Sequence, residues 1–209
     1  MKQASSIKAL FLDIGGVLLT NGWGQQSRMR AAKHFGFDYD EFNARHLVIF
    51  DTYESGKMKL EEYLQLVLFY QSTNFTMDEF QDFLFNESKP YLEMIDLISN
   101  IKHYYGLRTI AVNNEPKEIN EYRIRQYELD SLIDVFASSC YVQTRKPDKY
   151  IYHVALNLAQ ARPEEVVYID DRVVLIEAAR QLGLNAIHHT SVASTRDALS
   201  AFGLNYNLS

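Results

Sequence analysis

Three short apolar runs, each ending directly in polar side chains, constrain the fold of this chain more than any other feature. These are residues 9–12 (ALFL) before Asp13, residues 109–112 (TIAV) before Asn113, and residues 166–169 (VVYI) before Asp170 and Asp171. Short apolar runs with helical segments between them are typical of strands buried in a parallel sheet. The sequence therefore predicts an α/β fold, in which a doubly wound, Rossmann-like parallel sheet carries helices on both faces.

Residues 25–88 differ from the rest of the chain because they show no strand-like alternation. Their apolar side chains repeat every three to four residues, as on the buried stripe of a helix. Thr76 with Glu79 predicts a capping box at a helix start. We expect residues 21–88 to form a small all-helical domain, inserted after the first strand into a core made of residues 1–20 and 89–209.

The second half of the chain predicts the remaining elements of the sheet. Short strands are expected near residues 135–137 and 186–188, and a last helix near residues 193–202. Lys146-Pro147 predicts the start of another helix, because proline is favoured just inside the first turn. Gly183 is well placed to end the helix that follows the third apolar run.

Composition excludes several classes of function. The net charge is -6 without a dense Lys/Arg cluster, so neither a nucleic acid nor an anionic membrane surface is an expected partner. Cys140 is the only cysteine, which excludes a disulfide framework and a thiolate zinc site. The N-terminal apolar run stops at Asp13, too early for a signal peptide or a membrane span. We expect a cytoplasmic protein, and the oligomeric state stays open.

The polar residues after the strands predict one shared site, because ligands of doubly wound sheets bind beyond the carboxyl ends of the strands. The candidates are Asp13, Asn113, Asn114, Lys146, Asp170 and Asp171. Any one of them would be an ordinary turn or cap residue, but their order along the chain favours a site. Two carboxylates at neighbouring strand ends repel unless a cation lies between them. Oxygen ligands without a Cys or His cluster suit Mg²⁺.

The segments FLDIGGVLL, IAVNNEP, RKPDKYIYHVAL and VVYIDDRVVLIEAARQLGL resemble the four ordered signatures of the haloacid dehalogenase superfamily. The helical insertion resembles the small cap of its dehalogenase and phosphatase branch. The resemblance implies that Asp13 is the nucleophile and that Lys146 and Asn113 assist catalysis. It also implies two binding sets. The substrate would be bound by Asn113, Asn114, Lys146, Gly15 and Gly16, and Mg²⁺ by Asp13, the Gly15 carbonyl, Asp170 and Asp171.

The chain departs from the superfamily pattern at three positions. Most phosphatases of the superfamily carry a second Asp, a general acid and base, where this chain has Gly15. Its loss typically costs on the order of 10²–10⁴ in rate for a poor leaving group, so we expect a good one, such as an anomeric sugar phosphate or an acyl phosphate. Leu175 replaces a common Asn or Asp and weakens support for the ion, and Gln143 replaces a common Gly.

Three functions remain open from the sequence. The first is a Mg²⁺-dependent phosphatase for a small phosphorylated metabolite, which works through an aspartyl-phosphate. The second is a metal-independent 2-haloacid dehalogenase, a reaction that does not need a second Asp. The third is a binding or regulatory protein on a decayed enzyme scaffold, which Gly15 and Leu175 together suggest.

Further residues carry two readings each. Arg28, Arg30 and Arg45 suit an anionic substrate and equally suit solvated helix faces. Asn21 and Trp23 suit a substrate pocket, although packing where the two domains meet explains Trp23 as well. His188-His189 lacks a third metal ligand at a sensible spacing.

Overall fold

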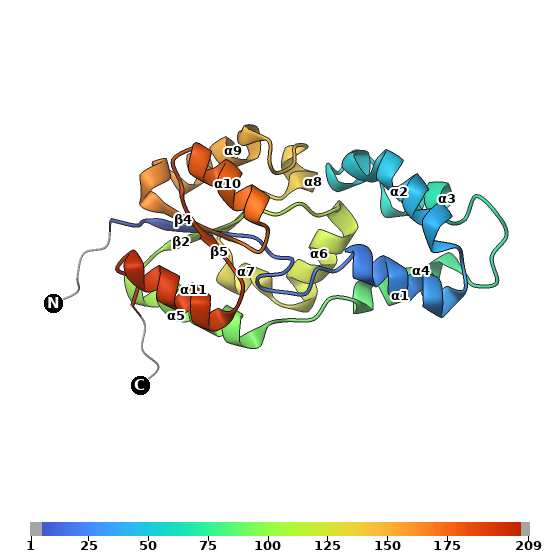
Figure 1. Cartoon of the computed structure of the whole chain (residues 1–209), viewed down its shortest axis with the longest axis horizontal. Coiled ribbons are helices and arrows are strands. Elements are labelled where there is room, and N and C mark those ends of the chain that lie inside the picture. Colours follow the sequence, from blue (N-terminus) through green and yellow to red (C-terminus); the bar gives the residue numbers. More distant parts are fainter. Residues whose placement is uncertain (1–5, 206–209) are drawn as a thin grey trace.

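The fold comes from a computed structural model that describes residues 6–205. Its centre is a five-stranded, fully parallel sheet in the order β3-β2-β1-β4-β5 (Figure 1). The strands are β1 (Ala9–Leu12), β2 (Arg108–Ala111), β3 (Val135–Phe136), β4 (Val166–Asp170) and β5 (Asn185–His188). The predicted α/β class is confirmed, and β1 lies at the centre because it pairs with both β2 and β4.

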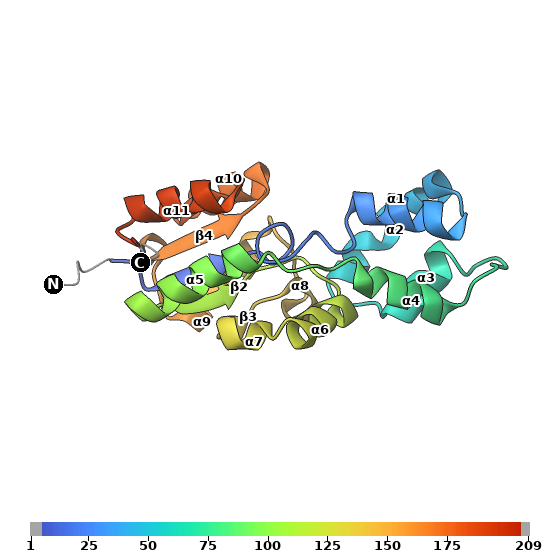
Figure 2. The same cartoon turned by 90° about the horizontal axis from the view of Figure 1, so that it is seen from below.

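Helices cover both faces of the sheet, as the apolar character of β1 on both sides requires. Successive side chains of a strand point to opposite faces. Leu10 and Leu12 accordingly pack with α5 (Leu92–Tyr105) and α11 (Val192–Ala201), whereas Phe11 packs with α9 (Lys149–Ala159) and α10 (Val173–Gln181). In Figure 1 α9 and α10 lie above the sheet and α5 and α11 lie below it, and Figure 2 views the molecule from the side of α5 and α11. Every residue of β1 is fully buried, which holds the strand end that leads into Asp13 in one place.

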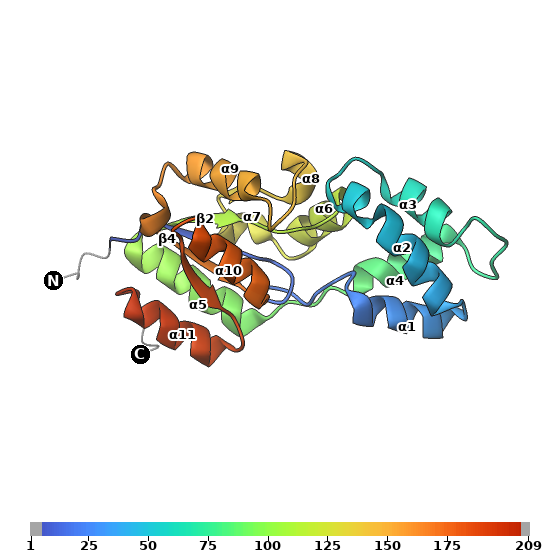
Figure 3. The same ribbon diagram turned by 45° about the horizontal axis from the view of Figure 1, so that its top comes forward.

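Four helices lie between β1 and α5, the helix that leads into β2: α1 (Gln25–Phe35), α2 (Tyr39–Glu54), α3 (Leu60–Val67) and α4 (Met77–Asn86). We call residues 25–86 the helical unit. It lies beyond the carboxyl ends of the strands (Figures 1 and 3). The predicted capping box of Thr76 and Glu79 opens α4. The boundaries of a separate domain at residues 21 and 88 stay a prediction.

The helical unit has an aromatic core of its own. Trp23 meets Phe42 and Phe80 edge-on, with ring centroids 6.1 Å and 5.7 Å apart. Tyr53 stacks on Tyr63 at 4.2 Å. Edge-on and offset pairs are the favoured arrangements of aromatic rings, so these contacts hold the helices of the unit together.

The remaining helical elements lie between the later strands. They are α6 (Lys117–Gln126), α7 (Leu129–Leu132), α8 (Ser139–Val142) and the 3₁₀ turn Pro163–Glu165. Across residues 6–205, no helix combines the length and the hydropathy needed to cross a membrane.

The helix that we expected to open at Lys146-Pro147 opens later, at Lys149, so this prediction is wrong. The Lys146-Pro147 peptide bond is cis and lies in the preceding loop. The helix is capped by Asp148, whose carboxylate accepts a hydrogen bond from the Tyr150 N–H at 2.8 Å. A side-chain acceptor in this place satisfies a donor that the first turn leaves free. Lys146 is thereby a loop residue, next to the sheet edge.

Candidate active site

Asp13 is the first residue beyond β1, and the backbone fixes its position. Its N–H donates to the Ile169 carbonyl at 2.9 Å, which continues the pairing of β1 with β4. The chain then folds back on itself, with a bond from the Leu18 N–H to the Ile14 carbonyl at 3.0 Å. Asp13 is 7% exposed, so its carboxylate is largely buried at the carboxyl end of β1.

Lys146 lies between two carboxylates. Its ammonium nitrogen is 3.1 Å from Oδ1 of Asp13 and 2.7 Å from Oδ2 of Asp170, and its side chain is 1% exposed. Asn114 holds the backbone of Lys146 at both ends. Its Oδ1 accepts from the Lys146 N–H at 2.8 Å, and its Nδ2 donates to the Lys146 carbonyl at 2.9 Å. Asn114, which we predicted to bind substrate, therefore positions Lys146.

The three acidic residues predicted as metal ligands come together. Asp13, Asp170 and Asp171 each offer one carboxylate oxygen, and these oxygens lie within 4.8 Å of one another. The Tyr168 hydroxyl also donates to Asp170. Oδ1 of Asp171 is buried without a hydrogen-bond partner among residues 6–205. A buried carboxylate oxygen without a partner is costly, and three converging carboxylates fit a hard divalent ion. Their role as ligands stays a prediction.

The electrostatics of the site work against an ionised nucleophile unless another cation is present. Burial raises the pKa of Asp13 to about 7, and the negative charge of Asp170 adds to this, whereas Lys146 opposes it. Burial alone would lower the pKa of Lys146, but the carboxylates of Asp13 and Asp170 outweigh it and raise that pKa. Lys146 is therefore a cation, and a divalent ion beside Asp13 would favour the carboxylate form further.

The two glycines after Asp13 meet different neighbours. Gly16 has a φ of +82°, and a Cβ there would lie 2.1 Å from Oδ2 of Asp171. Glycine is thus required both by the backbone and by the space that Asp171 fills. At Gly15 a Cβ would lie 3.2 Å from Oδ1 of Asn21 and 3.7 Å from Nη1 of Arg123. The amide and the guanidinium occupy the surroundings where a second Asp would project.

Asn113 does not join the cavity that Asp13 lines. Its Nδ2 donates to Oδ1 of Asn120 at 3.0 Å, and its Oδ1 accepts from the Ser138 hydroxyl at 2.7 Å. The residue is 1% exposed and is not part of the cavity wall. The predicted contact of the Asn113 amide with a substrate oxygen is therefore corrected: this amide ties the start of α6 to the loop after β3.

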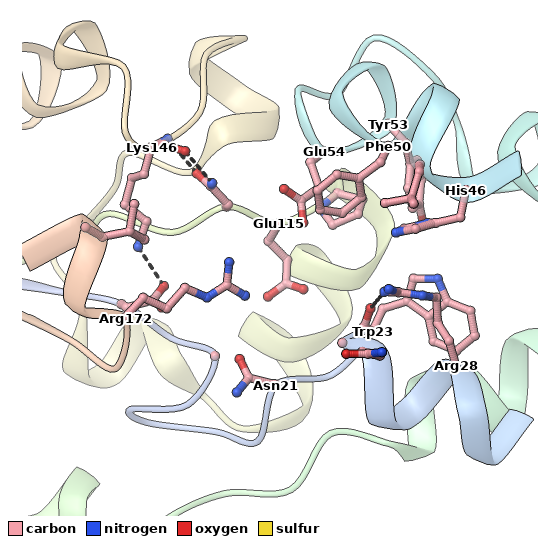
Figure 4. Close-up of a pocket in the computed structure, with 18 of the residues that line it drawn as sticks. Asn21, Trp23, Arg28, His46, Phe50, Tyr53, Glu54, Glu115, Lys146 and Arg172 are labelled. Atoms are coloured by element: carbon pink, nitrogen blue, oxygen red, sulfur yellow. Dashed lines mark hydrogen bonds and ion pairs between the residues drawn. The ribbon is translucent and has the colours of Figure 1, made fainter. Parts of the chain in front are cut away.

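A cavity of about 280 Å³ separates the sheet edge from the helical unit (Figure 4). It is polar on both sides. The core contributes Asp13, Gly15, Asn114, Glu115, Arg123, Lys146, Arg172 and Leu175. The helical unit and the segment that leads into it, residues 21–24, contribute Asn21, Trp23, Arg28, His46, Phe50, Tyr53 and Glu54. Both roles that the sequence allowed for Trp23 are present, because its ring packs in the aromatic core and also lines the cavity.

Residues 7–183 match the family of haloacid dehalogenase-like hydrolases. This match spans most of the chain and includes every strand-end residue described above. The chain belongs to this family. It is a haloacid dehalogenase-like hydrolase, as its four sequence signatures predicted.

One curated relative matches this hydrolase over most of both chains. It is the phosphorylated carbohydrates phosphatase of Thermotoga maritima, which is 25% identical over 187 residues, 87% of this chain and 84% of the relative.

Two solved structures illustrate the similarity of fold. One is a haloacid dehalogenase family enzyme of Bacteroides thetaiotaomicron in complex with magnesium and inorganic phosphate. It has a TM-score of 0.73 at 18% identity and covers 87% of this chain and 93% of its own. The other is a dehalogenase, with a TM-score of 0.63 at 19% identity, covering 87% of this chain and 84% of its own.

Sequence reasoning missed several charged residues of the hydrolase cavity. Glu115 pairs with Arg123 at 2.5 Å, and both are buried. Arg123 also donates to the Thr20 carbonyl at 2.8 Å and to the Ser88 hydroxyl at 2.9 Å. These two residues flank the helical unit, so one guanidinium fastens both of its connections to the core. Glu115 had a usable signal, since it directly follows Asn113-Asn114.

Glu54, the last residue of α2, is the helical unit's own carboxylate in the cavity wall. Its Oε2 lies 2.8 Å from Arg145. Burial raises the pKa of Glu54 to about 8, although Arg145 opposes the shift. Periodicity gave no signal for this residue, because it lies at a helix end and its partner is far along the chain.

The three arginines of the helical unit separate clearly in the structure. Arg30 binds Glu87, with its Nε 2.9 Å from the carboxylate. Arg45 binds Glu41 at 3.2 Å. Arg30 and Arg45 therefore form ion pairs at the surface, in line with the sequence interpretation of solvated helix faces. Arg28 is 8% exposed and lines the cavity.

The remaining candidates are ordinary structural residues. His188 contacts the backbone carbonyl of Asp171 at 3.0 Å, and His189 contacts the Thr195 hydroxyl at 2.7 Å. Burial raises the pKa of Cys140 to about 12, which argues against a thiolate nucleophile.

Leu175 and Gln143, the other two departures from the superfamily pattern, have clear surroundings. Leu175 is buried and gives the cavity wall an apolar spot. Gln143 has a φ of +56°. This left-handed conformation explains why glycine suits the position in relatives.

Proposed function

We propose that this hydrolase is a Mg²⁺-dependent phosphatase for a small phosphorylated metabolite, with a sugar phosphate as the preferred class. The observation that carries the proposal is the arrangement of Asp13, a buried carboxylate at a strand end, beside the ammonium of Lys146 and two further carboxylates. The phosphorylated carbohydrates phosphatase of Thermotoga maritima, similar over most of its length, supports the same class.

The proposed reaction has two steps. An oxygen of Asp13 attacks phosphorus, the bond from phosphorus to the leaving oxygen breaks, and an aspartyl-phosphate forms. Water then attacks phosphorus, releases inorganic phosphate and restores the carboxylate. Phosphoryl transfer depends chiefly on positioning and on neutralising charge. Lys146 supplies one positive charge beside the nucleophile.

Mg²⁺ would be held by Asp13, Asp170, Asp171 and the carbonyl of Gly15. When bound, it would neutralise charge on the phosphoryl oxygens and on the carboxylates. The buried, unpartnered Oδ1 of Asp171 supports a cation at this place. Gly15 offers no carboxyl group to protonate the leaving oxygen, so the proposed substrates have leaving groups that depart readily as anions.

The test is hydrolysis of an aryl phosphate with Mg²⁺ by the wild type and by Asp13→Asn. We expect at least about a 10³-fold loss in kcat, because the nucleophile is removed. Asp197→Asn, an exposed carboxylate on α11, is the matched control and should retain full activity. Equal turnover in the wild type and in Asp13→Asn would rule the mechanism out.

A metal-independent 2-haloacid dehalogenase is the second candidate, favoured by the absence of a side chain at Gly15. Chelation separates the two reactions. Loss of activity with EDTA and its recovery with Mg²⁺ support the phosphatase. Halide release from a 2-haloacid that survives thorough chelation supports the dehalogenase.

A further inference from the structure

The cavity wall formed by the helical unit contains a buried cation that has no acidic partner among residues 6–205. Arg28, on α1, is 8% exposed. Its Nη1 donates to the Trp23 carbonyl at 2.9 Å and its Nη2 donates to Oδ1 of Asn43 at 3.3 Å. Both acceptors are neutral, and Nε has no hydrogen-bond partner within residues 6–205. Burying a guanidinium without an anion is unfavourable, so this side chain has the capacity to bind one more acceptor.

His46 provides a second donor in this wall, and two hydrogen bonds indicate which of its ring nitrogens carries the proton. Nε1 of Trp23 donates to the Tyr63 hydroxyl at 3.0 Å, and that hydroxyl lies 2.8 Å from Nδ1 of His46. The indole nitrogen is only a donor, so the Tyr63 hydroxyl accepts from Trp23, and we assign its own proton to the bond with Nδ1 of His46. Burial, with the nearby charge of Arg28, lowers the pKa of His46 to about 3. His46 is therefore neutral and carries its proton on Nε2.

The third polar group of this wall is the hydroxyl of Tyr53. The residue is 1% exposed and lines the cavity, and its hydroxyl has no hydrogen-bond partner in the described part of the chain. Glu54, the carboxylate of the same wall, pairs with Arg145 and forms no ion pair with Arg28 in the described part of the chain. Figure 4 shows Arg28, His46 and Tyr53 on the side of the cavity opposite Lys146.

We propose that Arg28 is a specificity-determining residue that binds an anionic oxygen group, a carboxylate or a second phosphate, on the leaving group of the substrate. The Nε2–H of His46 and the Tyr53 hydroxyl are the neutral donors beside it. The inference rests on the proposed function, which assigns the phosphoryl end of the substrate to Asp13 and Lys146. A planar guanidinium suits such oxygen pairs because it binds them through two parallel hydrogen bonds.

The test measures binding in the Asp13→Asn background with Mg²⁺, where turnover does not interfere. The probes are phenyl phosphate, 4-carboxyphenyl phosphate and benzene-1,4-diyl bisphosphate. We expect one or both of the probes that carry a second anionic group to bind at least about tenfold more tightly than phenyl phosphate, as a charge-assisted contact provides. The probe that binds more tightly than phenyl phosphate identifies the bound group as a carboxylate or as a phosphate. Equal Kd values for all three probes, or binding of none, would overturn the proposal.

Variants assign the preference to Arg28. Adding Arg28→Met should abolish it, and Arg28→Lys should retain part of it because the charge remains. The control is Arg30→Met, on the same helix but paired with Glu87, which should leave the preference intact. A preference that persists undiminished in Arg28→Met contradicts the assignment.

A structure of Asp13→Asn with 4-carboxyphenyl phosphate is the second measurement, in case Arg28→Met does not fold. The carboxylate should contact the guanidinium of Arg28, and a carboxylate bound elsewhere overturns the proposal. Because these readouts are affinities and positions, a wild type that hydrolyses no aryl phosphate would refute the proposed function and leave the Arg28 result readable by itself.

Discussion

The ammonium of Lys146 lies 3.1 Å from Oδ1 of Asp13, at the end of a side chain that is 1% exposed. The same ammonium contacts Asp170 at 2.7 Å, so one monovalent cation serves two buried carboxylates. One positive charge does not neutralise the three carboxylates of Asp13, Asp170 and Asp171, which lie close together. The imbalance is the physical basis for expecting a divalent ion here.

Removal of Lys146 should harm both catalysis and stability. In Lys146→Met we expect kcat/KM for an aryl phosphate to fall by about 10²–10³, the effect of losing one group that stabilises developing charge. The melting temperature without Mg²⁺ should fall, because two carboxylates lose their cation, and Mg²⁺ should raise it more than in the wild type. Lys149→Met, exposed on α9, should match the wild type in both assays. An unchanged response to Mg²⁺ would contradict this picture of the charges.

Gly16 should be far less tolerant than another glycine of the same backbone conformation. Gly16 and Gly36 both have positive φ, of 82° and 74°, but a Cβ at Gly36 meets nothing within 4 Å. Gly36→Ala should cost about 1–2 kcal/mol, the usual penalty of the left-handed region. Gly16→Ala adds a collision with Asp171, so it should cost more and also weaken stabilisation by Mg²⁺. Equal losses in thermal unfolding would show that the contact with Asp171 is unimportant.

The buried pair of Arg123 and Glu115 should show strong coupling. Arg123→Met leaves Glu115 without its partner and releases the bonds to Thr20 and Ser88, so we expect a loss of about 3–5 kcal/mol in the free energy of unfolding. The double variant with Glu115→Met should lose less than the sum of the single losses. Arg125→Met, exposed on α6, is the control. Additive losses in urea unfolding would show that the two residues act independently.

The buried His46 should make stability fall in mild acid. Its pKa is about 3 in the folded state, against an ordinary value of 6.5, because burial and then Arg28 disfavour the charged ring. Between these values the unfolded chain binds a proton that the folded chain does not, so stability rises with pH across this window. His46→Gln should therefore lose less stability than the wild type between pH 7 and pH 4.5. His103→Gln, exposed on α5, should behave as the wild type does. Parallel curves for the wild type and His46→Gln would refute this.

The strand ends were predictable from sequence because each rests on a short-range signal, a fully apolar run that stops at a polar residue. Asp13, Asp170 and Asp171 were placed at strand ends in this way, and their roles stay predictions. Asn113 was assigned to the wrong surroundings, because the direction of its amide depends on Asn120 and Ser138, which are distant in the chain.

The helical wall of the cavity was beyond sequence reasoning for the same reason. Arg28 has the same character in the sequence as Arg30 and Arg45. Only the structure shows that Arg28 is the buried one, with its guanidinium bound to the Trp23 carbonyl and to Asn43. Lys146 lies beside Asp13, as expected from the sequence, and its catalytic role stays a prediction. The helix start expected at Pro147 was wrong, because Asp148 caps the helix.

The most direct test of the account is a crystal structure of the wild type with Mg²⁺ and beryllofluoride, a mimic of a phosphoryl group bound to a carboxylate. The account predicts beryllium bonded to an oxygen of Asp13, with Lys146 beside it and a magnesium ion among Asp13, Asp170 and Asp171. A bare Asp13 carboxylate, with no ion at the acidic cluster, would contradict it.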